Sequence, residues 1–283
     1  MLEFSRTLTA RIGGVAPEVH EPRSIADFVR IVDHLCEKGR PFRILGGGSN
    51  VLAADGVFDE PIILSRGLSA LRAHTARLWE VEAGVNLTTL AHRSAELGLQ
   101  GLECCAGIPG TVGAAIHINA GGRFGSIGAV VREVQVLCRD GNVCRREVGP
   151  ADFQYRRTSF FESLVLSAVL ELDPGDPAHS RDRVREVVTH KRATQPLRLP
   201  SAGCVFRNPR TGASAGKLID EAGLKGARVG GAMVSILHAN YLVNVDRASS
   251  ADYFALIGLV RNEVRSRFGV DLELEVEVWN HQN

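Results

Sequence analysis

The sequence lacks an excess of either charge. Its 33 Lys and Arg residues are balanced by 32 Asp and Glu residues, which leaves a formal net charge of +1 at pH 7. A large basic excess is what draws a protein to nucleic acid or to an anionic membrane surface without a specific site. We therefore expect neither partner, and any anionic ligand has to be bound by a local group of residues.

Cysteine is scarce and long apolar runs are missing. The cysteines number six, and no two of them have Cys-x-x-Cys spacing: Cys36, Cys104, Cys105, Cys138, Cys144 and Cys204. This usage excludes a disulfide framework, predicts no metal site and fits a reducing cytoplasm. The longest apolar stretch, residues 164–172, is far shorter than the ~20 residues of a spanning helix, and the first thirty residues carry no lysine-flanked apolar run. We therefore expect neither membrane insertion nor secretion.

What the sequence has is enough apolar residues for a large core. It contains 283 residues, of which 45% are hydrophobic, a length that suggests roughly two domains. Helical spacing of apolar residues and capping signals predict helices at 25–38, 87–97 (capped by Asn86), 181–193, 215–222 and 251–268. Alternation predicts strands at 78–85, on both sides of Asp140-Gly141, at 238–246 and at 272–279. A domain boundary is expected after Gln195-Pro196.

Two glycine-rich segments are candidates for binding a phosphate group. The first is "LGGGSNVL", with Gly46, Gly47, Gly48, Ser49 and Asn50; the second, "GIPGTVGAAIHINAGGRFG", spans 107–125. Neither is a dinucleotide fingerprint or a P-loop. Their backbone N–H groups are accessible enough to hold a diphosphate, but tight turns and close packing explain glycines equally well. The residues alone leave both interpretations open.

Seven segments occur in the order found in one enzyme family. They are "LGGGSNVL", "AGIPGTVGAA", "NAG", "FQYRRTSF", "AGCVFRNP", "SAGKLIDEAGLKG" and "GGAMVSILHANYLVN". Together they resemble the UDP-N-acetylenolpyruvoylglucosamine reductases, flavoenzymes of peptidoglycan precursor synthesis, from about Ala10 to Trp279. The short spacing between the fourth and fifth segments is similar to the compact subclass, which lacks an extra substrate-closing loop.

The resemblance implies an α+β protein with a FAD-binding fold of the vanillyl-alcohol-oxidase (PCMH) type. It implies FAD-binding subdomains at 1–66 and 67–194, an α+β substrate-binding domain at 195–270 and a C-terminal strand with the catalytic carboxylate at 271–283. NADPH would be the hydride donor, UDP-N-acetylglucosamine enolpyruvate the substrate, and the protein a monomer or weak homo-oligomer. The implied FAD-binding residues are Gly46, Gly47, Gly48, Ser49, Asn50, Gly107, Ile108, Pro109, Gly110, Thr111, Gly113, Asn119, Ala120 and Gly121.

The expected chemistry requires a cation near the substrate carboxylate. Hydride addition to an enol ether conjugated with a carboxylate builds negative charge there, which a fixed arginine stabilises. Arg156 matches the family's arginine, and the neighbouring Arg157 is interpreted as a bystander. Tyr155 is either a substrate contact or a packed aromatic. Without the motif, a surface or structural role for Arg156 would be preferred.

The family resemblance assigns proton delivery to Cys204, where most members have serine. A thiol, with an ordinary pKa of ~8.5, is mostly protonated at neutral pH, although a nearby arginine would favour a thiolate that cannot donate. The alternative is an inert cysteine. The family's catalytic glutamate maps onto Glu275, in an alternating stretch where Glu273 and Glu277 can equally form a solvated face. Glu277 departs from the family, which commonly has arginine there.

Four further residues are predicted to bind the substrate: Asn208, Lys217, His238 and Asn240. Lysines are more often simply exposed, and a lone histidine is usually structural. Two other functions stay open: another flavin oxidoreductase on the same scaffold, and a non-catalytic protein that binds flavin or a sugar nucleotide.

Overall fold

The computed structural model describes residues 1–279, which form two compact units. The central unit contains residues 19–47 and 60–190. The terminal unit contains residues 1–18, 48–59 and the chain from 191 onward. None of the helices in residues 1–279 has the length and apolar character needed to cross a membrane. The predicted subdomain boundaries stay predictions.

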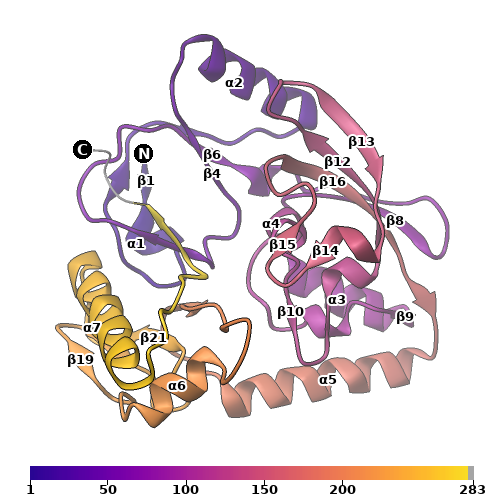
Figure 1. The fold of residues 1–283 in the computed structure, drawn as a ribbon. Helices are drawn as coiled ribbons and strands as arrows, with labels where there is room; N and C mark the ends of the chain where they lie inside the picture. The colour runs from indigo at the N-terminus through magenta and orange to yellow at the C-terminus, as the bar shows by residue number, and fades with distance from the viewer. Residues whose placement is uncertain (280–283) are drawn as a thin grey trace. The chain divides into compact units, whose positions relative to one another are not determined.

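The central unit is built on an antiparallel five-stranded sheet of order β13-β12-β16-β8-β7 (Figure 1). A second, three-stranded sheet of order β3-β6-β4 is parallel. The strands of these sheets are β3 (Val19–His20), β4 (Arg43–Leu45), β6 (Ile62–Leu64), β7 (Leu71–Ala73), β8 (Leu78–Glu82), β12 (Val131–Leu137), β13 (Val143–Glu147) and β16 (Leu164–Glu171). The short pairs are β9 (Leu99–Gln100) with β17 (Asp173–Pro174), β10 (Gly121–Gly122) with β11 (Gly125–Ser126), and β14 (Phe153–Gln154) with β15 (Arg157–Thr158). Its helices are α2 (Ile25–Glu37), α3 (Leu87–Glu96), α4 (Val112–His117) and α5 (Pro177–Thr194), whose last turn belongs to the terminal unit.

Helices α2 and α3 form where capping and apolar spacing predict them. The Ser24 side chain accepts a hydrogen bond from the Asp27 N–H, and the Asn86 side chain accepts one from the Thr89 N–H. These caps satisfy backbone donors that the first turn leaves unpaired. Apolar residues on one face of α2, including Phe28, are buried against the sheet. Both helix predictions are confirmed.

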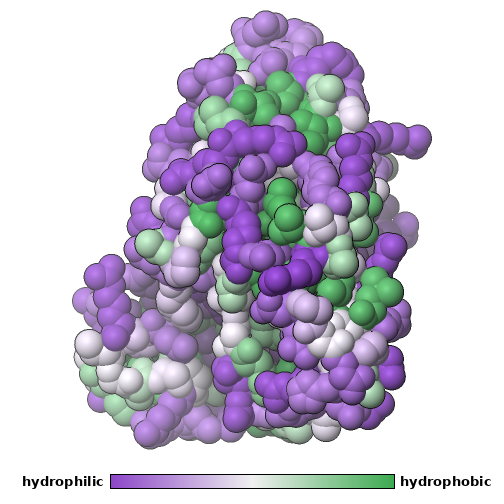
Figure 2. All heavy atoms as spheres, turned by 90° about the vertical axis from the view of Figure 1, so that its right-hand side faces the viewer, coloured by the Kyte–Doolittle hydropathy of each residue, from purple (hydrophilic) through white to green (hydrophobic). Residues whose placement is uncertain are grey.

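The hairpin predicted around Asp140-Gly141 joins β12 to β13, which is an edge strand. Gly141 has φ +84°, a conformation that glycine adopts without strain. All five residues of β13 are exposed, and charged side chains at Arg145, Arg146 and Glu147 protect this edge from pairing with other chains. On the face seen in Figure 2, hydrophilic side chains separate several small hydrophobic patches.

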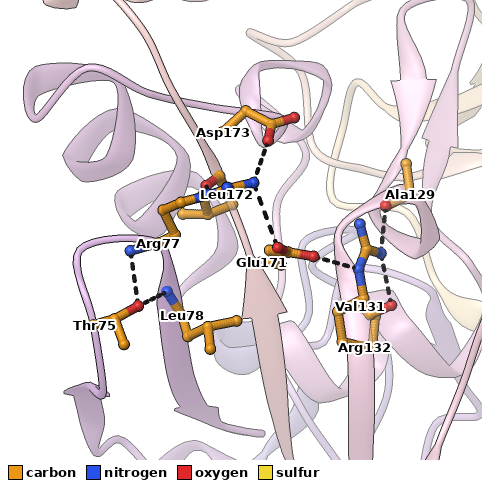
Figure 3. A network of polar contacts seen from close by, with 9 residues as sticks. All are labelled: Thr75, Arg77, Leu78, Ala129, Val131, Arg132, Glu171, Leu172 and Asp173. Atoms are coloured by element: carbon orange, nitrogen blue, oxygen red, sulfur yellow. Dashed lines mark hydrogen bonds and ion pairs between the residues drawn. The ribbon is translucent and has the colours of Figure 1, made fainter.

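An ionic network ties neighbouring strands of this sheet together (Figure 3). The Glu171 carboxylate lies 2.9 Å from Arg132 Nε and 3.4 Å from Arg77 Nη2, and Arg77 also pairs with Asp173 at 2.8 Å. These side chains are partly exposed, so each pair contributes roughly 0–1 kcal/mol. The network therefore adds little to the stability of this unit.

The terminal unit is built on a four-stranded antiparallel sheet of order β18-β21-β20-β19. These strands are β18 (Ser201–Cys204), β19 (Arg228–Val229), β20 (Ala232–Val234) and β21 (Tyr241–Asn244). Two further pairs are β1 (Leu2–Glu3) with β2 (Val15–Ala16), and β5 (Val51–Ala53) with β22 (Glu277–Trp279). The helices are α1 (Phe4–Thr7), α6 (Ala215–Glu221) and α7 (Ser250–Phe268). Tyr253, Leu256 and Val260 of α7 are buried in this unit's own core.

The last strand is shorter than the alternation predicts. Strand β22 covers only Glu277–Trp279 and runs parallel to β5, while residues 272–276 are irregular apart from a bridge between Leu274 and Phe206. The predicted strand over 272–279 is thus wrong in its first half, because that segment bonds to the end of β18 before the chain turns to β5. Residues 280–283 of the predicted C-terminal strand lie outside the described residues.

Candidate active site

Gly46 and Gly47 of the first glycine-rich segment pack against the second segment too closely for any side chain. A methyl group on Gly47 would lie 2.6 Å from the Gly110 Cα, and one on Gly46 would lie 2.7 Å from Thr111 Oγ1. Thr111 is buried, and its hydroxyl has no hydrogen-bond partner within residues 1–279. A buried hydroxyl without a partner is costly, so this cradle is suited to a ligand that offers one. These features fit the diphosphate of FAD.

The rest of the second glycine-rich segment supports this cradle. The Thr88 hydroxyl donates to Ile108 O at 2.9 Å, and a methyl group on Gly113 would lie 2.5 Å from Ala83 Cβ. Gly107 and Gly110 both have positive φ. The remaining predicted FAD-binding residues of this segment lie in the same unit: Pro109, Asn119, Ala120 and Gly121. The FAD contacts of all these residues stay predictions.

Arg156 occupies the turn between β14 and β15 with φ +55°, a left-handed conformation that costs an arginine roughly 1–2 kcal/mol. Asn119 secures this turn, because its Nδ2 donates to Gln154 O and its Oδ1 accepts from Gly128 N, both at 3.1 Å. Arg156 Nη1 itself donates to Gly121 O at 3.3 Å. The "NAG" segment thus holds the arginine's hairpin. Such strain is common at functional sites.

Tyr155 and Arg157 flank Arg156 in this turn. Tyr155 is exposed, and its ring centroid lies 5.3 Å from the Arg156 guanidinium carbon. Arg157 is exposed as well. Tyr155 is therefore not a packed core aromatic, which leaves its predicted contact with substrate open to test.

In the terminal unit, Cys204 and Glu275 lie on backbones that are hydrogen-bonded to each other. Cys204 ends β18 opposite Tyr241, and the next residue, Val205, accepts a hydrogen bond from the Glu275 N–H at 2.8 Å. Arg207 N donates to Glu273 O at 2.9 Å on the same pair of segments. Two residues that are 71 positions apart in the chain (275 − 204) are therefore neighbours in the fold.

Two predicted substrate-binding asparagines hold this region of the backbone. The Asn240 amide donates to Phe206 O at 2.8 Å and accepts from Phe206 N at 2.9 Å. Asn208 Oδ1 accepts from Ala215 N at 3.0 Å, at the start of α6. Both side chains position the strand and loop beyond Cys204. Their substrate contacts stay predictions.

Lys217 and His238 differ in their environments. Lys217 is exposed, with its Nζ 3.6 Å from Glu221. His238 is half-buried, its Nδ1 accepts from Asn240 N at 3.3 Å, and its ring packs edge-on against Tyr241. Burial lowers the pKa of His238, with a smaller lowering from Lys225, although its backbone hydrogen bond acts the other way. The neutral imidazole is therefore favoured in the fold.

The glycine loop is divided between the two units after Gly47. Gly48 has φ +66° and its carbonyl accepts from Thr9 N at 3.0 Å. Asn50 Nδ2 donates to Glu275 O at 3.2 Å. Ser49 and Asn50 therefore belong to the same unit as Cys204 and Glu275.

One departure from the family has a structural explanation, and one residue was missed. Glu277 Oε1 accepts from Trp279 Nε1 at 2.7 Å, so this carboxylate satisfies the indole of a buried tryptophan. Arg207 was not among the predicted site residues. Its Nε is buried without a hydrogen-bond partner in the described chain. The sequence did contain a signal for Arg207: it is a cation that lies between Cys204 and Asn208 in the segment "AGCVFRNP".

Comparisons with known proteins match both parts of the chain to the family that the sequence resembles. A family model for a FAD binding domain matches residues 16–146, and one for the C-terminal domain of UDP-N-acetylenolpyruvoylglucosamine reductase matches residues 195–279. A reductase 2 of that name from Symbiobacterium thermophilum is 40% identical over 280 residues, covering 98% of this chain and 91% of the relative. One from Chloroherpeton thalassium is 41% identical over 276 residues, covering 95% and 88%.

A solved structure is similar as well. The UDP-N-acetylenolpyruvylglucosamine reductase from Thermus caldophilus superposes with a TM-score of 0.81 at 35% identity, covering 98% of this chain and 97% of that one. The α+β, PCMH-type FAD fold expected from the sequence is confirmed. The chain therefore belongs to the UDP-N-acetylenolpyruvoylglucosamine reductase family and is a FAD-dependent oxidoreductase of peptidoglycan precursor synthesis.

Proposed function

We propose that this enzyme reduces UDP-N-acetylglucosamine enolpyruvate to UDP-N-acetylmuramate with NADPH as hydride donor, and that Cys204 delivers the proton. The observation that carries the proposal is the hydrogen bond from Glu275 N to Val205 O, which places the thiol and the carboxylate on adjacent backbones. FAD, held by the glycine cradle at Gly46, Gly47 and Gly110, would supply hydride transfer when bound.

We assign Arg156 the role of binding the substrate carboxylate. Its guanidinium stabilises the negative charge that develops there as hydride adds to the methylene carbon. The left-handed turn that presents Arg156 is secured by Asn119, so the cation is oriented before the substrate binds.

We assign Cys204 the role of donating the proton that completes the lactyl group. A thiol must stay protonated to donate, and a cation nearby would oppose this. We assign Glu275 to the same part of the site, because its N–H is bonded to the carbonyl of the residue that follows Cys204. In its protonated form, Cys204 can take the place of the serine that is common in the family.

The anionic part of the substrate requires local cations, because the net charge is only +1. Lys217 is one candidate for the diphosphate. Arg207, whose Nε is buried and unpartnered in the described chain, is a second. Asn208, His238 and Asn240 complete the proposed substrate-binding set. We expect the reaction to take place in the cytoplasm, where a nucleotide sugar and a nicotinamide coenzyme are available, and the enzyme to be a monomer or weak homo-oligomer.

The proposal is tested under anaerobic conditions. NADPH should bleach the flavin absorbance of the purified protein, and adding the enolpyruvate substrate should restore it rapidly. A flavin that NADPH reduces but this substrate does not reoxidise would overturn the assigned reaction. Failure of NADPH to reduce the flavin, with substrate-dependent reoxidation after chemical reduction, would overturn the donor alone.

The proton donor is tested by Cys204→Ala and Cys204→Ser. We expect Cys204→Ala to lose at least ~100-fold in turnover, the usual size of general acid catalysis, while FAD content and flavin reduction are unchanged. Cys204→Ser should retain activity. Cys36→Ala, at an exposed cysteine of α2, is the matched control. Unchanged turnover in Cys204→Ala would remove the cysteine from the mechanism.

A further inference from the structure

Both backbone polar groups of Glu275 are held by partners distant in the chain. Its N–H donates to Val205 O at 2.8 Å, and its carbonyl accepts from Asn50 Nδ2 at 3.2 Å. The Asn50 carbonyl also accepts from Glu277 N at 2.8 Å. Asn50 thus contacts the backbone on both sides of residue 276.

These bonds matter because Glu275 does not lie in a strand. Strand β22 begins at Glu277, and residues 275 and 276 are in irregular structure. The N–H groups of Glu275 and Val276 reach Val205 O at 2.8 and 3.4 Å, and the Asn50 amide holds the Glu275 carbonyl. The Asn50 bond is made by a side chain, so it can be deleted without changing any backbone group.

We propose that Asn50 is a positioning residue for Glu275, and that its amide sets where the carboxylate lies relative to Cys204. The inference rests on the catalytic role proposed for Glu275. Without the amide, the half-buried Glu275 carbonyl loses the hydrogen bond from Asn50, and the orientation of its peptide is less firmly held. A displacement of about 1 Å at a reacting group can cost roughly 100-fold in rate.

This role differs from the one that the glycine-rich motif predicts for Asn50, which is contact with FAD. One Nδ2 proton of Asn50 is donated to Glu275 O. A contact between the Asn50 side chain and FAD would have to use the second Nδ2 proton or Oδ1. The two roles affect different steps. Loss of a cofactor contact changes FAD content or flavin reduction, whereas loss of positioning changes only reoxidation by the enolpyruvate substrate.

The test uses Asn50→Ala and Asn50→Asp, with Asn142→Ala as the control. Asn50→Asp keeps the size of the side chain and replaces the donor by an acceptor that repels the Glu275 carbonyl. Asn142 is in the exposed β12–β13 turn, where its side chain bonds to Asp140. We expect both Asn50 variants to hold FAD and be reduced by NADPH within about twofold of wild type. Reoxidation by the substrate should be slower by roughly 10- to 100-fold.

A double-mutant cycle separates positioning from a general structural role. If Asn50 acts through Glu275, then adding Asn50→Ala to Glu275→Gln should slow reoxidation by less than about twofold further. Amide hydrogen exchange in the peptide 272–279 should be faster in Asn50→Ala than in wild type, and unchanged in Asn142→Ala.

The outcomes are distinguishable. Additive effects of Asn50→Ala and Glu275→Gln, or a loss of FAD in both Asn50 variants, would overturn the positioning role while the proposed reaction stands. A Glu275→Gln enzyme that reoxidises at the wild-type rate would instead overturn the role of Glu275 itself. A slow, non-additive Asn50→Ala with normal FAD content supports the inference.

Discussion

The two units carry their predicted site residues in different ways. In the central unit, the predicted cofactor residues are largely backbone: glycines packed so closely that a methyl group at Gly47 would meet Gly110 at 2.6 Å. In the terminal unit, the site consists of side chains, Cys204 and Glu275 among them, on segments whose backbone is already hydrogen-bonded. The central unit therefore depends on the close packing of its glycine backbone, and the terminal unit depends on the functional groups of its side chains.

This difference predicts how each unit tolerates mutation. A substitution in a close-packed loop must move the backbone, so it changes folding and binding together. A substitution on a hydrogen-bonded segment removes one functional group and leaves the fold in place. Arg156 is the exception in the central unit, because it is a side chain presented by a strained turn.

The largest effect is expected for Arg156→Gly. This variant keeps the left-handed backbone conformation at position 156 and removes the guanidinium group. Glycine adopts φ +55° without the roughly 1–2 kcal/mol that an L-residue pays, and this offsets the lost contact with Gly121. We expect the free energy of unfolding to change by less than about 0.5 kcal/mol, while turnover falls at least ~100-fold. Urea unfolding and steady-state kinetics measure the two effects. Arg157→Ala should keep turnover within about twofold, and a joint loss of stability and activity in Arg156→Gly would mean that Arg156 is structural.

A smaller effect, on the cofactor, is expected for Gly47→Ala. Its methyl group cannot fit against Gly110 unless the loop shifts, which typically costs about 1–3 kcal/mol. The purified protein should contain less FAD, measured by the ratio of visible to ultraviolet absorbance, and should unfold at a lower temperature. Gly122→Ala, where no atom lies within 4 Å of the added methyl, is the control. Full FAD content in Gly47→Ala would contradict a cradle that depends on shape.

The smallest effect is on the pH dependence of stability through His238. Its folded pKa lies below the ordinary 6.5, mainly because of burial, so the unfolded chain binds more protons between the two values. Stability from this group is therefore lost as the pH falls through and below 6.5, by less than about 1.4 kcal/mol per pH unit. Urea unfolding of wild type and His238→Asn at pH 7.5, 6.5 and 5.5 should show the difference shrinking on acidification. A pH-independent difference between the two proteins would rule this out.

Sequence reasoning succeeded where the determining interactions are local. Helices α2 and α3 follow from apolar spacing and from caps at Ser24 and Asn86, each of which lies within three residues of its partner. The β12–β13 hairpin follows from Asp140-Gly141 in the same way. Helix α5 starts earlier than predicted, at Pro177, because proline is well suited to the first position of a helix even though it also marks turns.

The long-range parts of the site could not be predicted. Asn50 has all the appearance of a glycine-loop residue, yet its amide bonds to Glu275, which lies 225 positions later. The end of "LELEVEVW" pairs in parallel with β5, and alternation carries no information about that partner. The sequence alone gives no reason for a glutamate at position 277, whereas the fold shows that its carboxylate accepts a hydrogen bond from Trp279 Nε1.

The pairing of β5 with β22 has a consequence for synthesis on the ribosome. Every residue of the central unit has been made by position 190, but β5, whose three residues are all buried in the finished fold, meets its partner only when Glu277–Trp279 emerge. At typical elongation rates of ~5–20 residues per second, that wait lasts roughly 10 to 45 s. During it, an apolar strand edge is open to pairing with other chains, so the nascent terminal unit is the part of this enzyme that most needs protection from aggregation.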